Sequence, residues 1–173
     1  MKLELKGIKH AEFASQETHC YEANLYVNGK NVARVSNEGM GGPDLQQVHC
    51  YKQSNAKIKE NTRLYKEACE YLEKQDTLLE YWCCDRVNDY LTLKDMKRDV
   101  RINILYYIPL SENGTTKVDL LLCSYRKPGT RKRVPITQTH IDRFKNDPEH
   151  KGAVLLNELS DADKLLHYHK HIK

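Results

Sequence analysis

The feature that most constrains the fold is a run of alternating apolar and polar residues interrupted by an Asn-Gly pair. Apolar side chains occupy every second position of 21–27, and the returning segment 30–36 contains Val32 and Val35. A period of two is typical of a β-strand. Asn28-Gly29 supplies the two positive φ angles of a type I′ turn. The sequence therefore predicts a β-hairpin over residues 21–36.

The N-terminal half continues with a strand signal, a break and two helix signals. Residues 2–9 alternate like a strand with one solvated face, whereas 36–44 breaks all periodicity, so we expect the chain to leave the sheet there. Apolar residues then recur every three or four positions over 54–74 and 76–97, which predicts two amphipathic helices packed as a hairpin. Ser54 or Asn55 can cap the first helix.

The C-terminal half returns to short elements. Residues 100–106 and 118–125 match strands around a turn at 111–115, and the apolar run in the second suggests burial on both faces. Further predictions are a helix from Thr137 or Thr139 to Phe144, a strand over 153–156, and a capping box at 160–163 that opens a last helix.

Length and element order together predict the fold class. The chain has 173 residues, which is enough for one domain and too little for two full ones. The order is strand, hairpin, helix pair, hairpin, helix, strand and helix. We therefore expect one α+β domain over residues 1–173, in which an antiparallel or mixed sheet packs against a helical hairpin.

Composition excludes several classes of protein. No apolar run approaches the roughly 20 residues that cross a bilayer, and residues 1–10 do not resemble a signal peptide. Membrane spanning and conventional secretion are therefore not expected. The six cysteines read as reduced thiols of a protein in the cytoplasm of its host cell, with adjacent Cys83 and Cys84 pointing away from each other on a helix.

Three glycines form the first candidate site. Gly39, Gly41 and Gly42 could turn backbone N–H groups towards a phosphate, with a helix starting some residues later. The segment lacks the Gly-Lys-Ser/Thr ending of a P-loop, and about ten residues separate it from the helix. A sharp exit from the hairpin is the alternative explanation for the same glycines.

A basic loop forms the second candidate site. The net charge of +4 and the pI near 8.6 lie below the values typical of nucleic-acid-binding domains, but residues 126–133 hold five cations and no acid. Such a loop could neutralise phosphates beside a stacking aromatic, grip an acidic protein surface, or stay solvated. The candidate residues are Tyr125, Arg126, Lys127, Arg131, Lys132 and Arg133.

Catalysis, metal binding and a cofactor receive little support. The histidines at 167, 169 and 171 and the pairs His19-Cys20 and His49-Cys50 invite a metal hypothesis, but no metal-binding motif surrounds them. Paired carboxylates at metal spacing are absent, which disfavours a small hydrolase or nuclease. We assign no catalytic residue, metal or cofactor. Eleven tyrosines against two phenylalanines favour a binding protein instead.

Two segments carry a resemblance to a group of small uncharacterised proteins of bacteriophages and mobile elements. Residues 17–42, with the Asn-Glu-Gly-Met-Gly-Gly stretch after the hairpin, resemble that group, and residues 152–159 are similar to its closing segment. Together they cover about a fifth of the chain. The resemblance implies a phage-borne accessory protein, for which interference with host defence is a common role, and it assigns no site residue.

These observations lead to two functional hypotheses. The first is a non-catalytic phage or mobile-element protein that engages a macromolecular partner through its basic loop and surface tyrosines, such as an inhibitor of a CRISPR complex. The second is a protein that binds or sequesters nucleotides or nucleic acid through the glycine segment and the basic loop.

Overall fold

The computed structural model describes residues 1–108 and 121–172, excluding the side chains at 167 and 169–172. The chain forms two compact units, Met1–Tyr90 and Leu91–Lys173, and each is described by itself. Helices and antiparallel sheets occur in separate segments, so the predicted α+β class is confirmed. That residues 1–173 fold as one domain stays a prediction.

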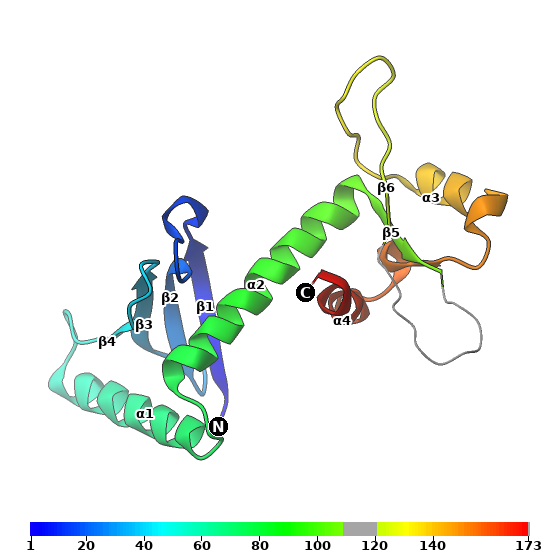
Figure 1. Cartoon of the computed structure of the whole chain (residues 1–173). Coiled ribbons are helices and arrows are strands. Elements are labelled where there is room, and N and C mark those ends of the chain that lie inside the picture. The colour runs from blue at the N-terminus through cyan, green and yellow to red at the C-terminus, as the bar shows by residue number, and fades with distance from the viewer. Residues whose placement is uncertain (109–120, 173) are drawn as a thin grey trace. The chain divides into compact units, whose positions relative to one another are not determined.

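A four-stranded antiparallel sheet forms the frame of the first unit (Figure 1). Its strands are β1 (Leu3–His10), β2 (Cys20–Val27), β3 (Lys30–Glu38) and β4 (Leu45–Val48), paired in chain order. A short 3-10 helix, η1 (Glu12–Ala14), lies between β1 and β2. Asn28 and Gly29 both have positive φ, at 49° and 82°, as the predicted hairpin turn requires.

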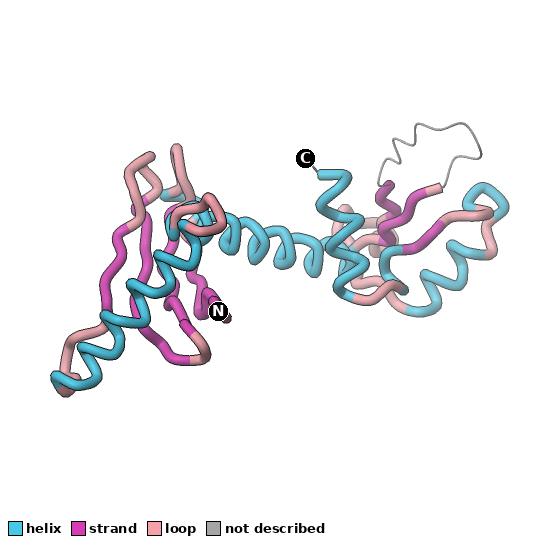
Figure 2. The backbone as a smooth tube through the Cα atoms, turned by 90° about the horizontal axis from the view of Figure 1, so that it is seen from below, coloured by secondary structure: helices cyan, strands magenta, loops and turns pink. Residues whose placement is uncertain are grey.

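The core of this unit lies on one face of the sheet. Every second residue of β2, from Tyr21 to Val27, is buried. Helix α1 (Asn55–Glu73) lies against this sheet (Figure 2) and contacts β2, β3 and β4. Its side chains Leu64, Ala68 and Leu72 are buried. Lys57 N donates to the Ser54 hydroxyl at 3.4 Å, which confirms Ser54 as the N-cap. Helix α2 (Leu79–Ile102) then starts after a short turn.

The expectation that the chain leaves the sheet after residue 36 is only half right. The chain turns away at the glycine segment but returns as β4, which pairs antiparallel with the middle of β3. This edge strand has four residues, and its Leu45 is exposed. Too few positions alternate in it to produce a recognisable sequence pattern.

A three-stranded antiparallel sheet of order β6-β5-β7 forms the centre of the second unit. Its strands are β5 (Ile104–Tyr107), β6 (Leu121–Cys123) and β7 (Val154–Leu155). The other elements, besides the second half of α2, are α3 (Gln138–Lys145), η2 (Pro148–His150), η3 (Leu156–Glu158) and α4 (Asp161–Ile172). One apolar cluster surrounds Leu105 and Leu156, and another surrounds Ile104 and Phe144.

Two predictions for this unit are wrong. Val100 and Ile102 belong to α2, not to a strand, because Val100 continues the helical face of Leu93 and Met96 into the same apolar cluster. Leu121 and Leu122 are exposed, not buried on both faces, because β6 is an edge strand that pairs only with β5. The predicted turn at 111–115 and residues 118–120 lie outside the described residues.

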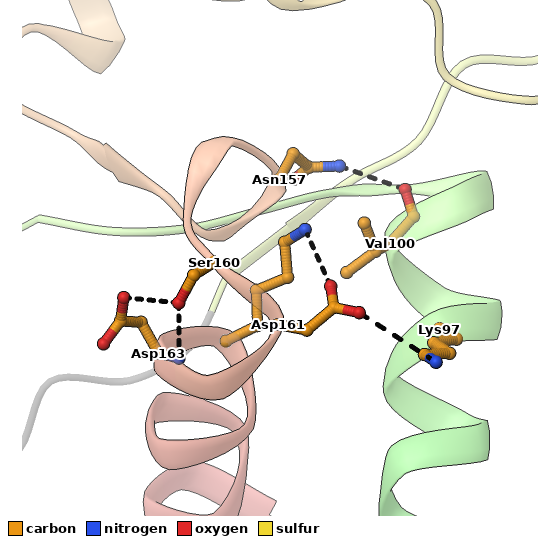
Figure 3. Close-up of polar contacts among 7 residues, drawn as sticks. Lys97, Val100, Asn157, Ser160, Asp161 and Asp163 are labelled. Atoms are coloured by element: carbon orange, nitrogen blue, oxygen red, sulfur yellow. Dashed lines mark hydrogen bonds and ion pairs between the residues drawn. The ribbon is translucent and has the colours of Figure 1, made fainter.

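The side chain of Asn157 joins the end of α2 to β5 (Figure 3). Its Nδ2 donates to the carbonyls of Val100 and Asn103, both at 3.0 Å, and its Oδ1 accepts from Leu105 N at 2.8 Å. Close by, the Ser160 hydroxyl accepts from Asp163 N at 3.2 Å and donates to Asp163 Oδ2 at 2.6 Å, which gives the Ser160 half of the predicted capping box at the start of α4. Among the described residues, no helix is long and apolar enough to span a bilayer.

Replacing Asn157 tests this junction. Asn157→Ala removes three hydrogen bonds and leaves backbone groups of α2 and β5 without their partner, so we expect the free energy of unfolding to fall by about 2–3 kcal/mol. Urea unfolding followed by circular dichroism measures the change. Asn146→Ala, at the exposed end of α3, is the control and should change stability by less than about 0.5 kcal/mol. Equal losses in both variants would contradict this role.

Candidate functional site

The basic loop is a hairpin-shaped loop, closed by a single antiparallel β-bridge, that projects beyond β6 (Figure 1, yellow). Val134 N donates to Tyr125 O at 2.9 Å, Arg126 and Arg133 form an antiparallel bridge, and Lys127 N donates to Lys132 O at 3.0 Å. Gly129, with a φ of 71°, lies at the tip. We call residues 125–134 the basic hairpin.

The cations of the basic hairpin have no acidic partner among the described residues. This contrasts with cations elsewhere on the surface: Arg34 pairs with Glu22 at 2.6 Å and Lys30 with Glu60 at 2.5 Å. In the hairpin, every predicted cationic side chain is exposed and none forms an ion pair within residues 1–108 and 121–172. These residues are Arg126, Lys127, Arg131, Lys132 and Arg133. The hairpin therefore concentrates positive charge that the described part of the chain leaves uncompensated.

Tyr125 connects the base of the basic hairpin to α3. Its ring stacks on His140 with centroids 4.3 Å apart and planes 22° apart, and its hydroxyl donates to His140 O at 3.4 Å. Burial raises the pKa of Tyr125. His140 in turn accepts a hydrogen bond from Thr137 N at 3.1 Å, which caps α3. One face of the Tyr125 ring is thus covered by the protein, so Tyr125 positions the hairpin.

The segment that contains Gly39, Gly41 and Gly42, here called the glycine segment, folds back on the loop before β2. Gly39 N donates to Asn37 Oδ1 at 2.8 Å, and Gly41 N donates to Thr18 Oγ1 at 3.3 Å. Gly39 O accepts from the N–H groups of residues 16, 17 and 18 at 2.9–3.4 Å. The N–H groups of Gly39 and Gly41 therefore already have acceptors inside the protein. These contacts are consistent with the alternative explanation for the glycines, which is a sharp exit of the chain from the hairpin.

The same segment forms one wall of a cleft of about 350 Å³ that the sequence did not reveal. The central group is Asp44, whose Oδ2 accepts from the Tyr21 hydroxyl at 2.5 Å and whose Oδ1 accepts from Asn37 Nδ2 at 3.0 Å. The start of α2 also lines the cleft, through Glu80, Tyr81 and Cys84. The cleft is lined by Thr18, His19, Tyr21, Asn37, Gly41, Gly42, Pro43, Asp44, Glu80, Tyr81 and Cys84.

The cleft is lined by two carboxylates, and three groups in or beside it have raised pKa values. Burial and the hydrogen bond to Asp44 raise the pKa of Tyr21 far above its usual range, so the phenol remains a donor. Burial, then the nearby carboxylates, raise the pKa of Cys84. Burial raises that of Cys83 to about 12. Cys83 is buried and Cys84 exposed, which confirms that they point apart.

The predicted phosphate-binding glycines and the predicted cations belong to different units, and each group is described within its own unit. Gly41 and Gly42 line the acidic cleft of the first unit, whereas the basic hairpin belongs to the second. Among the described residues, no three His, Cys, Asp or Glu side chains could hold a metal ion. The side chains of the histidines at 167, 169 and 171 lie outside the described part.

Comparisons with known proteins identify no relative. No protein-family model matches the chain, and neither a curated protein nor a solved structure matches it.

Replacing single glycines tests the structural role of the segment. A Cβ on Gly39 would lie 2.2 Å from Ala14 O and 2.9 Å from Cys20 Cβ at a φ of 85°, so Gly39→Ala should destabilise the protein by at least about 2 kcal/mol. A Cβ on Gly42 meets nothing within 4 Å, so Gly42→Ala should cost less than about 0.5 kcal/mol. Thermal unfolding of both variants measures the difference. A stable Gly39→Ala protein would overturn this role.

Proposed function

We propose that this protein is a binding protein that engages nucleic acid through the basic hairpin. The observation that carries the proposal is the group of five exposed cations without an acidic partner among the described residues. Each Lys or Arg that neutralises a phosphate releases a condensed counterion, which makes binding favourable at low salt. Cations already paired with a carboxylate gain less, because they must first give up that partner.

The shape of the basic hairpin supports the same proposal. The basic hairpin projects from the sheet with its cationic side chains exposed, so these side chains can reach the phosphates of a nucleic-acid backbone. Arginine also presents five donors in a planar fork that matches the phosphate oxygens. Contacts to phosphate carry no direct sequence information, so we propose binding with little sequence preference.

The modest net charge is compatible with this function because the charge is unevenly distributed. The whole chain carries +4, yet residues 126–133 alone contain five cations and no acid. Local charge determines the potential that a phosphate backbone meets at the hairpin, since charges more than about 10 Å away are screened at 0.1 M salt.

The resemblance to phage and mobile-element proteins supports a more specific partner. A nucleoprotein effector of host defence, such as a CRISPR complex, holds nucleic acid along its surface. We propose that the basic hairpin binds such a complex and interferes with it, in keeping with the role that the resemblance implies.

Salt dependence tests the phosphate contacts. Fluorescence anisotropy with labelled duplex and single-stranded oligonucleotides should show affinity that falls steeply with salt. Arg131→Ala with Arg133→Ala should weaken binding and reduce the slope of log K against log salt for the duplex by about 2. The matched control is Lys30→Ala with Arg34→Ala, which removes the same charge from ion-paired positions and should leave the slope unchanged. If neither oligonucleotide bound detectably at low salt, the result would contradict the proposal.

Affinity capture from a host lysate tests the nature of the partner. The full chain should retain a nucleoprotein, and retention should be lost after nuclease treatment or in the Arg131→Ala, Arg133→Ala variant. A single protein captured equally well after nuclease treatment, but lost with that variant, would show that the basic hairpin grips an acidic protein surface instead.

A further inference from the structure

We propose that the acidic cleft of the first unit binds an arginine side chain presented by a protein partner. The cleft is built from β2, the glycine segment and the start of α2, all within Met1–Tyr90. The proposal is independent of the nucleic-acid function, which concerns the basic hairpin of the other unit.

The charge of the cleft selects a cation. Asp44 and Glu80 line it, while no lysine or arginine does. A third carboxylate, Glu17, lies beside the lining residue Gly41, since a Cβ on Gly41 would be 2.2 Å from Glu17 Oε2. Within the described residues none of these three carboxylates is ion-paired. Glu80 lies in the first turn of α2, where the helix dipole stabilises its negative charge.

Asp44 is held in place before any ligand arrives. The Tyr21 hydroxyl and the Asn37 amide each donate to one of its oxygens, at 2.5 and 3.0 Å. A carboxylate has about four lone-pair sites, so two remain for a ligand. Binding a cation there requires little ordering of the carboxylate, and such preorganisation increases affinity.

The walls favour guanidinium over ammonium. Tyr81 lines the cleft and is 61% exposed, so the face of its ring is available for stacking. A guanidinium stacks on aromatic rings, is more weakly hydrated than an ammonium and offers five donors to separate acceptors. Two carboxylates from different elements, Asp44 and Glu80, line the cleft and suit a donor group that reaches in several directions.

The surroundings of the cleft favour a protein as the source of the arginine. A second hollow shares Asn37, Gly42 and Pro43 with the cleft and contains Met40 and Leu45, which are 64% and 57% exposed. Large apolar side chains beside a polar pocket are typical of protein interfaces. Arginine is among the residues that contribute most to such interfaces.

Peptide titration followed by NMR tests the proposal on the full-length chain. The probe is a pentapeptide with a central arginine flanked by leucine and glycine, compared with the same peptide carrying citrulline, the neutral isostere of arginine. We expect saturable shifts of the backbone amide signals of Gly41, Gly42 and Tyr81 with the arginine peptide. The citrulline peptide should bind at least about tenfold more weakly, since hydrogen bonds to charged groups are the stronger ones.

Variants of the α2 residues that line the cleft locate the binding site without disturbing Asp44. Glu80→Gln should weaken binding of the arginine peptide by about tenfold, and Tyr81→Ala should weaken it by a smaller factor. The control is Glu73→Gln, which removes the same charge from an exposed position of α1 outside the cleft and should leave affinity unchanged. Unchanged amide signals of the variants elsewhere in the spectrum verify the fold.

Several results would overturn the proposal. These are equal binding of the arginine and citrulline peptides, no binding of either, or equal effects of Glu73→Gln and Glu80→Gln. Self-association that disappears in the Arg131→Ala, Arg133→Ala variant would identify a second copy of this chain as the occupant, which also contradicts a separate protein partner.

Discussion

The side chain of Asn37 holds together the part of the first unit on which the cleft depends. Its Oδ1 accepts from the Thr18 hydroxyl and from Gly39 N, and its Nδ2 donates to Gly42 O and to Asp44. All the polar groups of this buried amide are therefore used. One residue thus joins the loop before β2, the glycine segment and the acidic group that defines the cleft.

Charge is distributed very differently at the two candidate surfaces and over the rest of the protein. Most surface cations of the first unit pair with a nearby carboxylate, and such exposed pairs contribute little to stability. The basic hairpin and the acidic cleft each collect charge of one sign, without an ion pair among the described residues. Concentrated charge of this kind strengthens association with a partner of opposite sign and speeds the encounter.

Elements with local signals could be predicted from the sequence, and those determined by distant contacts could not. The Asn28-Gly29 hairpin, the Ser54 cap and the Ser160 cap of α4 depend on residues a few positions apart. The end of α2 is bonded to Asn157, more than fifty residues away, whereas the local alternation of Val100, Ile102 and Ile104 predicts a strand. The cleft escaped prediction for the same reason, since Asp44 and Glu80 share no pattern of spacing. The cationic character of the basic hairpin could be predicted because its residues follow one another in the sequence.

The contacts of Asn157 also bear on the order in which the chain can fold during synthesis. The first unit pairs its strands in the order in which they leave the ribosome, so its sheet can assemble progressively. In the second unit, the carbonyls of Val100 and Asn103 accept hydrogen bonds from the Asn157 side chain. That side chain is synthesised 54–57 residues later. Until then, the nascent helix end has only water to satisfy those groups, and β5 lacks its neighbour β7. We therefore expect the second unit to complete its fold late in translation.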